Sequence, residues 1–139
     1  EMPVFSDPQL AMPGVVTVQG PQFTGYEQAQ QEMDTYSKAF LSKTSMPADT
    51  ALIVVCDDSR FTAATLNNFL WVTFTRSNPS HDIYGIDSFI RFKHWGCNGP
   101  VIIDARTKPH HASPLIPDPE TEKKVDRLFE KGGPLHQWR

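Results

Sequence analysis

The sequence has no run of Lys or Arg, no long apolar stretch and only two cysteines. Without a basic run, and with a formal net charge of −3, the chain lacks the electrostatic pattern that binds nucleic acid. No apolar stretch approaches the length of a membrane span, so we do not expect a membrane as a partner either. Proteins and small molecules are therefore the expected partners.

The two cysteines, Cys56 and Cys97, are too few for a disulfide framework, and no signal-peptide pattern precedes them. A reduced, cytoplasmic setting is the expectation. A structural zinc site needs thiolate and imidazole ligands at short, regular spacings. Because His94, Cys97, His110 and His111 do not have such a spacing, we predict no metal site.

The length and composition predict a single domain between two arms. With 139 residues and 39% hydrophobic content, the chain fits one modest core. We divide it into an irregular arm (1–13), an α/β domain (14–108), and a Pro-rich arm with a short surface helix and tail (109–139). The first arm is either a frayed terminus or a segment that wraps a partner subunit. In the last region, Asp118 followed by Pro119 is typical of a helix start.

The predicted centre of the domain is a strand over residues 51–55, which form a continuous apolar run ending at Asp57 and Asp58. Such a run is typical of a strand buried on both faces. The bulky residues between Phe61 and Phe74 then recur at intervals of three and four, which favours a helix lying on the sheet. Within that segment, residues 71–75 alternate and also permit a strand; we favour the helix.

A βαβ unit precedes this central strand. Residues 15–18 predict a strand, and the capping box from Thr24 to Glu27 predicts a helix start. The apolar stripe from Tyr26 to Phe40 is most simply core, with a groove for a partner helix as the alternative. Strand, helix and strand in this order imply a parallel pair with a right-handed crossover. The predicted fold class is therefore α/β, a single small layer domain with a mostly parallel sheet.

The second half of the domain contains another buried strand over residues 101–104, which also ends in a carboxylate. Before it, residues 83–98 have neither a helical nor a strand period. We predict a long loop there, and loops of this length in compact domains are commonly functional.

A spaced set of residues resembles the carboxyl-terminal domain of the UbiD family: Asp57, Asp58, Trp71, Thr75, Arg76, Pro79, Asp82, Asp104 and Lys108. The resemblance spans residues 20–108. Members of that family are decarboxylases and carboxylases of aromatic and unsaturated acids, and they use prenylated flavin mononucleotide (FMN). In the family the segment that contains the Trp and Arg is helical, which agrees with the pattern above.

The resemblance implies a function only within an assembly. UbiD enzymes bind their flavin on another domain, so we expect this chain alone to bind no cofactor and to be inactive. Prenylated FMN, with a divalent and a monovalent cation, is expected on a larger UbiD-like catalytic subunit, and the assembly resembles those of anaerobic aromatic degradation. The family further implies that one stretch forms a wall of the substrate pocket: Tyr84, Ile86, Phe89, Phe92 and Trp95.

Most of the charged residues of the set have two interpretations. Asp57 and Asp58 either bind a cation at the end of the central strand or cap the next helix, and capping is favoured. We predict that Arg76 and Asp82 form a buried ion pair. Asp104 and Lys108 are expected to form a framework pair or, less simply, to face an active site across an interface. No catalytic residue is predicted in this chain.

Three hypotheses follow for the whole chain. The first is a small, non-flavin-binding subunit of a multi-subunit UbiD-like carboxylase or decarboxylase, which provides assembly contacts and one wall of the substrate pocket. The second is a fragment of a single-chain UbiD decarboxylase. The third is a non-catalytic binding or assembly module that kept the fold.

Overall fold

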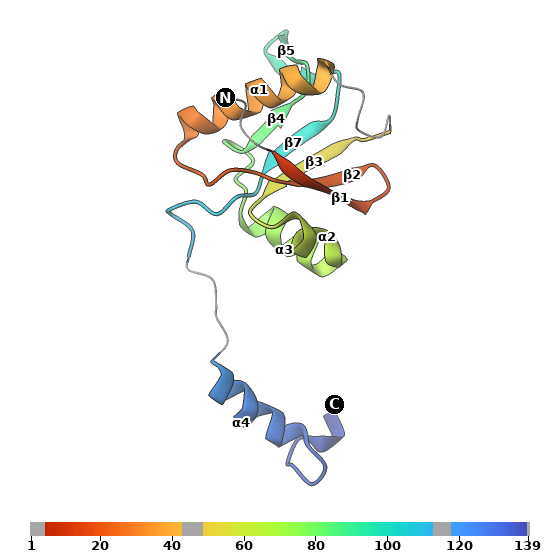
Figure 1. The fold of residues 1–139 in the computed structure, drawn as a ribbon, viewed down its shortest axis with the longest axis vertical. Helices are drawn as coiled ribbons and strands as arrows, with labels where there is room; N and C mark the ends of the chain where they lie inside the picture. The colour runs from red at the N-terminus through yellow and green to blue at the C-terminus, as the bar shows by residue number, and fades with distance from the viewer. Residues whose placement is uncertain (1–4, 43–48, 113–117, 139) are drawn as a thin grey trace.

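A five-stranded sheet forms the centre of the computed structural model, which describes residues 5–42, 49–112 and 118–138 (Figure 1). The strand order is β1-β2-β3-β7-β4, in which β2, β3 and β7 are parallel and the two edge strands are antiparallel to their neighbours. The predicted α/β class is confirmed. The strands of this sheet are β1 (Ser6–Met12), β2 (Val15–Gln19), β3 (Leu52–Cys56), β7 (Val101–Asp104) and β4 (Ile83–Gly85).

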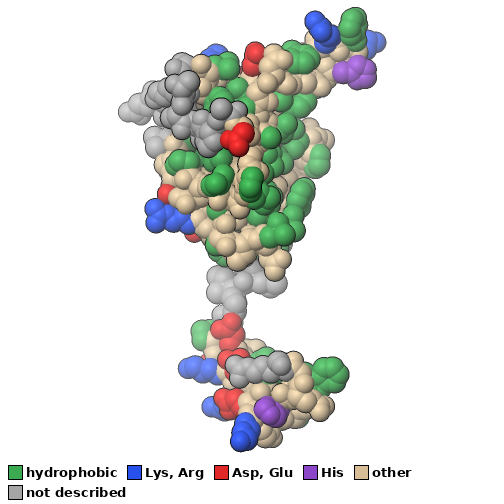
Figure 2. All heavy atoms as spheres, turned by 90° about the vertical axis from the view of Figure 1, so that its right-hand side faces the viewer, with side chains coloured by type: hydrophobic (Ala, Val, Ile, Leu, Met, Phe, Trp, Pro, Cys, Tyr) green, Lys and Arg blue, Asp and Glu red, His purple; other side chains and the backbone are tan. Residues whose placement is uncertain are grey.

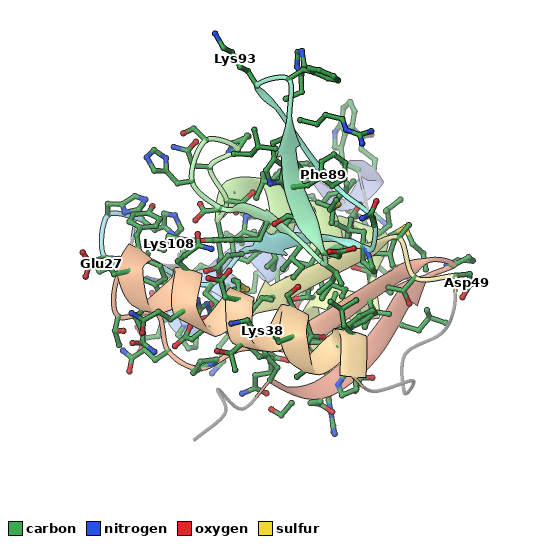
Figure 3. All side chains as sticks on the ribbon, turned by 90° about the horizontal axis from the view of Figure 1, so that it is seen from above. Glu27, Lys38, Asp49, Phe89, Lys93 and Lys108 are labelled. Atoms are coloured by element: carbon green, nitrogen blue, oxygen red, sulfur yellow. The ribbon has the colours of Figure 1, made fainter. Side chains whose placement is uncertain are left out.

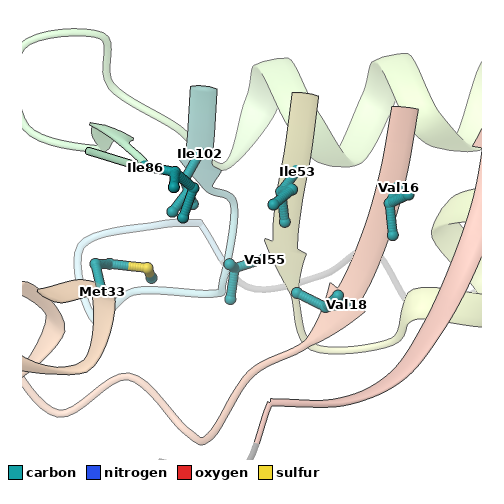
Figure 4. Close-up of a cluster of buried hydrophobic side chains, with 7 residues drawn as sticks. All are labelled: Val16, Val18, Met33, Ile53, Val55, Ile86 and Ile102. Atoms are coloured by element: carbon teal, nitrogen blue, oxygen red, sulfur yellow. The ribbon is translucent and has the colours of Figure 1, made fainter. Parts of the chain in front are cut away.

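Helices cover both faces of the sheet (Figure 1). Helix α1 (Tyr26–Ser42) lies on one face and connects β2 to the parallel strand β3, so the predicted βαβ unit is confirmed. Helices α2 (Ser59–Ala64) and α3 (Leu66–Thr75) lie on the other face. Between α1 and the sheet, seven buried side chains form the larger apolar cluster (Figure 4): Val16, Val18, Met33, Ile53, Val55, Ile86 and Ile102.

Strand β3 is buried on both faces, as its continuous apolar run predicts. Ile53 and Val55 pack toward α1, while Val54 packs against Phe69 and Val72 of α3 in a second cluster. The segment after β3 is helical, as predicted, but it is broken at Thr65. There the Thr65 hydroxyl accepts a hydrogen bond from the Asn68 amide and starts α3.

Two helix starts test the capping predictions. Helix α4 (Pro119–Phe129) begins after Asp118, whose carboxylate accepts from the Thr121 amide at 3.1 Å, as predicted. For α1, the Ala29 amide donates to the Gly25 carbonyl, so the helix starts one residue later than the capping box indicates. The chain ends in a 3₁₀ turn, η1 (His136–Trp138). Most of the segment between α1 and β3, residues 43–48, lies outside the described residues.

The prediction of an irregular first arm was wrong for residues 6–12. They form edge strand β1, which pairs with β2 through an irregular register. Asp7 has a φ of 49° and its carboxylate accepts from Arg60 at 2.8 Å, so polar contacts shape this strand as much as the ladder does. Its sequence has no clean alternation and contains a proline, which is why the strand was missed.

The predicted loop over residues 83–98 was also wrong. It contains β4 and a projecting hairpin made of β5 (Ser88–Arg91) and β6 (His94–Cys97). At the hairpin base, a Cβ atom added to Gly85 would come within 2.5 Å of the Cys97 Cβ. The strands are too short to show a period, and the turn has neither Gly nor Asn, so the sequence lacked the usual hairpin signal.

Candidate functional site

Five buried charged side chains meet at the carboxyl ends of β3 and β7, the edge where open α/β sheets place their ligands. Each of them is at most 6% exposed. Because β7 ends at Asp104, the residues that follow turn across this edge and face helix α1 and the loop before β4. We call this group the buried charge cluster: Glu32, Asp82, Asp104, Arg106 and Lys108.

Arg106 joins β7 to α1. Its Nη2 and Nε donate to the two carboxylate oxygens of Asp104 at 2.8 and 2.9 Å, and its Nη1 donates to Glu32 Oε2 at 2.7 Å. Nη1 also reaches the carbonyl of Pro21 at 2.9 Å. Burial alone would lower the pKa of Arg106, but the two carboxylates outweigh burial and raise it, so the guanidinium stays charged.

Lys108 contacts Asp82 and three backbone carbonyls in the remaining part of the buried charge cluster. Its Nζ donates to the backbone carbonyls of Asp104 at 2.9 Å, Arg76 at 3.0 Å and Arg106 at 3.3 Å. The Nζ also lies 3.3 Å from Asp82 Oδ1, an ion pair without a well-aligned hydrogen bond. The other oxygen of Asp82 accepts from the Asn78 amide at 2.6 Å and so closes the turn that contains Pro79.

Aromatic rings and one glycine enclose the buried charge cluster. The Phe23 ring lies over both cations, 5.6 Å from Arg106 Cζ and 5.4 Å from Lys108 Nζ. Gly20 allows the Arg106 side chain to pass, because a Cβ there would come within 2.9 Å of Arg106 Cδ. Burial raises the pKa of Tyr84 to about 12, and the charges of Asp104 and Asp82 add to this shift.

The two aspartates after β3 have structural roles: one caps a helix and the other connects two segments of the chain. Asp58 caps α2 by accepting from the Phe61 amide at 2.9 Å. Asp57 Oδ2 accepts from Arg76 Nη1 at 2.8 Å and from the Thr107 amide and hydroxyl at 2.9 and 2.7 Å. The favoured capping prediction is therefore confirmed for Asp58, and Asp57 connects the segments that follow α3 and β7.

The two predicted ion pairs have different partners from those expected. Arg76 pairs with Asp57 and lies over the Trp71 ring at 5.0 Å, while Asp82 pairs with Lys108. Asp104 contacts Lys108 only through its backbone carbonyl. Thr75 donates to the Trp71 carbonyl within α3. Pairing across a sheet edge depends on which turns meet there, and sequence order does not reveal that.

Sequence reasoning missed Glu32 and Arg106. Glu32 interrupts the apolar stripe of α1 beside Met33, and a charge at such a position indicates a buried partner. Every charged group of the buried charge cluster has an opposite charge within 3.3 Å. Its chemistry is thus structural: it fixes the turns at this edge of the sheet to β7 and α1.

The residues predicted to form a pocket wall do not share one surface. Ile86 is fully buried in the apolar cluster of Figure 4, so it faces no pocket, and Tyr84 is half-buried against the same cluster. In the hairpin, Phe89 pairs with Gly96 and Ile90 pairs with Trp95. Because neighbouring residues of a strand face opposite sides, Phe89 and Trp95 lie on opposite faces of the hairpin.

Strand β5 and the residue after β6 border a hollow of about 350 Å³ lined by Phe89, Ile90, Arg91 and Asn98. An aromatic ring, a guanidinium and an amide suit a flat acid, because Arg can bind a carboxylate with two hydrogen bonds. The hollow is the feature of this segment that fits the predicted pocket wall best.

A second exposed apolar surface lies on α2 and α3. Hydrophobic side chains are exposed across the face of the sheet domain seen in Figure 2. On α3, the exposed side chains follow one another on successive turns of the helix. The ring of Phe61 on α2 contacts the Trp71 ring edge to face, with their centroids 6.3 Å apart. No described residue buries this surface, which consists of Phe61, Leu66, Leu70, Trp71 and Phe74.

The sequence is similar to a protein from Chlamydia pneumoniae that is named as a subunit of 4-hydroxybenzoate decarboxylase. The two are 36% identical over 78 residues, which make up 56% of this chain and 13% of that protein. An uncharacterized protein of Chlamydia muridarum is 34% identical over 80 residues, 58% of this chain and 14% of its own length. The predicted resemblance to a decarboxylase is confirmed, and this chain spans only a small part of the relatives that it matches.

Two solved structures of the vanillic acid decarboxylase of Sedimentibacter hydroxybenzoicus in open form resemble the fold in part. Their TM-scores are 0.48 and 0.47 with 19% and 20% sequence identity, and they cover 85% and 83% of this chain and 27% and 26% of those chains. No protein-family model matches the sequence. In the described part of the chain, no helix is long and apolar enough to cross a membrane.

Proposed function

We propose that the chain is a small subunit of a multi-subunit decarboxylase or carboxylase that resembles the UbiD family and acts on an aromatic acid. The observation that carries this proposal is the 36% identity to a protein named as a subunit of 4-hydroxybenzoate decarboxylase. In this role the chain supplies assembly contacts. The apolar side chains left exposed on α3 and on the hairpin support such a role, because water is a poor environment for them.

The cofactor of this proposal, prenylated FMN with a divalent and a monovalent cation, belongs to a larger catalytic subunit. The described carboxylates of this chain do not fit its cations. The carboxylates at the sheet edge are already bound by Arg, Lys and Thr donors. Among the described residues, no three His, Cys, Asp or Glu side chains come together to hold a metal ion.

In the assembly, the hollow beside Phe89 and Arg91 forms one wall of the substrate pocket. The test replaces Phe89 with Ala in the assembled enzyme, with Leu41→Ala on the exposed side of α1 as the control. We expect Phe89→Ala to lower kcat/KM by about tenfold or more, with native mass spectrometry showing an intact complex. Equal kcat/KM values for the two variants would show that Phe89 does not form part of the substrate pocket.

A second candidate is a part of a longer, single-chain decarboxylase. The observation in its favour is the small share of the relatives, 13 to 14%, that the matched residues cover. The two candidates differ in the size of the polypeptide that carries this sequence in its source.

The deciding experiment is native mass spectrometry and absorbance spectroscopy of the protein purified gently from its source without oxygen. The subunit proposal expects a 15.7 kDa chain bound to a larger polypeptide that has flavin absorbance and decarboxylates 4-hydroxybenzoate or a related acid. A longer polypeptide that contains this sequence would establish the second candidate. A bare monomer with no chromophore would overturn both and leave a binding or assembly module.

A further inference from the structure

The β5–β6 hairpin carries the two most exposed large apolar side chains of the described residues. Phe92 is 88% exposed and Ile90 is 78% exposed. The hairpin projects from the sheet with Lys93 at its tip (Figure 3). An aromatic side chain at the end of a projecting hairpin gains nothing from the fold of its own chain, so another surface is needed to bury it.

The turn at the tip indicates that these side chains are kept for binding. Arg91 pairs with His94, so the turn consists of Phe92 and Lys93, whose φ angles are 51° and 66°. Two-residue turns with both φ angles positive favour Asn-Gly, because bulky side chains are strained there. Such strain persists where the side chains have a role outside the fold, as at ligand clamps.

The base of the hairpin is held firmly. The Asn98 amide donates to the Asp87 carbonyl at 3.2 Å, and its side chain donates to the Asp87 carboxylate at 2.8 Å. The Asp87 amide in turn donates to the Ser37 hydroxyl of α1 at 3.3 Å. A tip on a fixed base loses less conformational entropy when it binds, so the hairpin is organised for binding before the partner arrives.

The charge of the hairpin specifies the chemistry of its partner. Residues 88–97 include Arg91, Lys93 and His94 and contain no Asp or Glu, whereas the whole chain has a net charge of −3. The basic side chains project at one corner of the molecule in Figure 2. A complementary surface therefore has an apolar slot for Phe92 and Ile90 with carboxylates around it.

A protein surface fits the hairpin better than a lipid bilayer. Among the described residues the hairpin forms a two-stranded sheet of its own, so the outer edge of each strand keeps unpaired N–H and C=O groups. Lipid cannot satisfy those groups, at a cost of several kcal/mol for each. A protein can pair them, as in strand addition to a sheet edge.

We infer that the tip of the β5–β6 hairpin, Ile90 to Lys93, inserts into an apolar slot with a carboxylate rim on the larger subunit. This inference rests on the proposed function. It assigns the docking contact to a segment that has no part in the buried charge cluster. Ile90 and Arg91 at the start of this segment also line the hollow beside Phe89, whereas Phe92 and Lys93 do not.

The test uses the complex reconstituted from this chain and the purified larger subunit, with the affinity measured by titration. The double substitution Phe92→Asn and Lys93→Gly installs the preferred turn sequence and removes both tip side chains, so the hairpin keeps its fold. We expect the Kd to rise by at least about tenfold. We also expect the wild-type affinity to fall when salt is raised from about 0.05 to about 0.5 M, since salt screens charge pairs at an interface.

A pair of charge-reversal variants separates an effect on binding from an effect on folding. Lys93→Glu reverses one charge at the tip, and Lys38→Glu makes the same change on the exposed side of α1 (Figure 3). We expect Lys93→Glu to raise the Kd by at least about tenfold and Lys38→Glu to leave it within about twofold. Equal affinities for both variants and the wild type would overturn the inference and leave the proposed function standing.

Two other outcomes are decisive. If the wild-type chain forms no complex with the larger subunit, the proposed function fails and the inference fails with it. If the chain instead binds vesicles of phosphatidylserine and phosphatidylcholine, and the double substitution abolishes that binding while the complex forms unchanged, the hairpin contacts a membrane and the inference is wrong.

Discussion

The buried charge cluster and the β5–β6 hairpin contain similar kinds of side chains, yet they differ in how those side chains are satisfied. In the cluster, the ion pairs are completed inside the chain and Phe23 lies over both cations. In the hairpin, the aromatic and basic groups face water. The comparison teaches that composition alone does not distinguish a framework from a binding surface; the presence or absence of partners does.

The largest expected effect comes from breaking the buried charge cluster at Arg106. Replacing it with Leu leaves Glu32 and Asp104 buried without an opposite charge. We expect the free energy of unfolding to fall by about 3 to 5 kcal/mol, as for other buried pairs that lose one partner. Urea unfolding measures this loss, and a loss below about 1 kcal/mol would show that the cluster does not hold the fold.

Lys108→Met should have the next largest effect. It removes the cation beside Asp82 and leaves three carbonyls without their donor, and we expect a loss of about 3 kcal/mol. Lys38→Met is the matched control, because Lys38 is exposed on α1, and it should change the free energy of unfolding by less than about 0.5 kcal/mol. Similar losses for the two variants would remove the distinction between buried and surface lysines.

Tyr84 tests the electrostatics around the cluster. Its pKa is raised from 10.0 to about 12 in the folded chain, so between these values the unfolded state releases the phenol proton first. The stability from the neutral phenol is therefore complete below pH 10 and is lost as the pH rises toward 12. Urea unfolding at pH 9 and pH 11.5 should show a larger loss for the wild type than for Tyr84→Phe; parallel losses would contradict this shift.

The reactivity of the two cysteines compares the core at the end of β3 with the base of the hairpin. Burial raises the pKa of Cys56 to about 11, and this thiol lies in the core at the end of β3. Cys97, at the hairpin base, is partly exposed. At pH 8, iodoacetamide should modify Cys97 first and Cys56 only when the chain unfolds. Peptide mass spectrometry checks the order, and early modification of Cys56 would mean that the core opens readily.

The smallest expected effect on stability comes from the hairpin tip. In the isolated chain, Ile90→Thr should change the free energy of unfolding by less than about 0.5 kcal/mol, because its side chain has almost no packing to lose. A thermal melt measures this change. A substantial loss would mean that the tip is part of the fold and would weaken the contrast with the cluster.

The sequence predicted the parts of the fold that rest on periodicity. Strand β3, the βαβ unit and the helical segment from Phe61 to Phe74 have clear apolar patterns, and the structure confirms them. Strand β1 and the hairpin were missed, because their patterns are short or interrupted and their geometry depends on neighbouring elements.

For the candidate site, the sequence identified individual residues better than their partners. Asp57, Asp82, Asp104 and Lys108 all lie at the predicted edge of the sheet. Their pairing was wrong because Arg106, the residue that joins two carboxylates, follows β7 in a segment with no pattern of its own. Contacts across a sheet edge are tertiary and leave no local signal.

Gly85 sets the direction in which the hairpin projects. The hairpin rests on Gly85 through Cys97 and Trp95, where even a methyl group would collide with both side chains. A strand of four residues extends about 13 Å, so a small change in the packing at Gly85 would move the tip by several ångströms. A side chain at position 85 would therefore displace the tip of the hairpin without changing any residue of the tip itself.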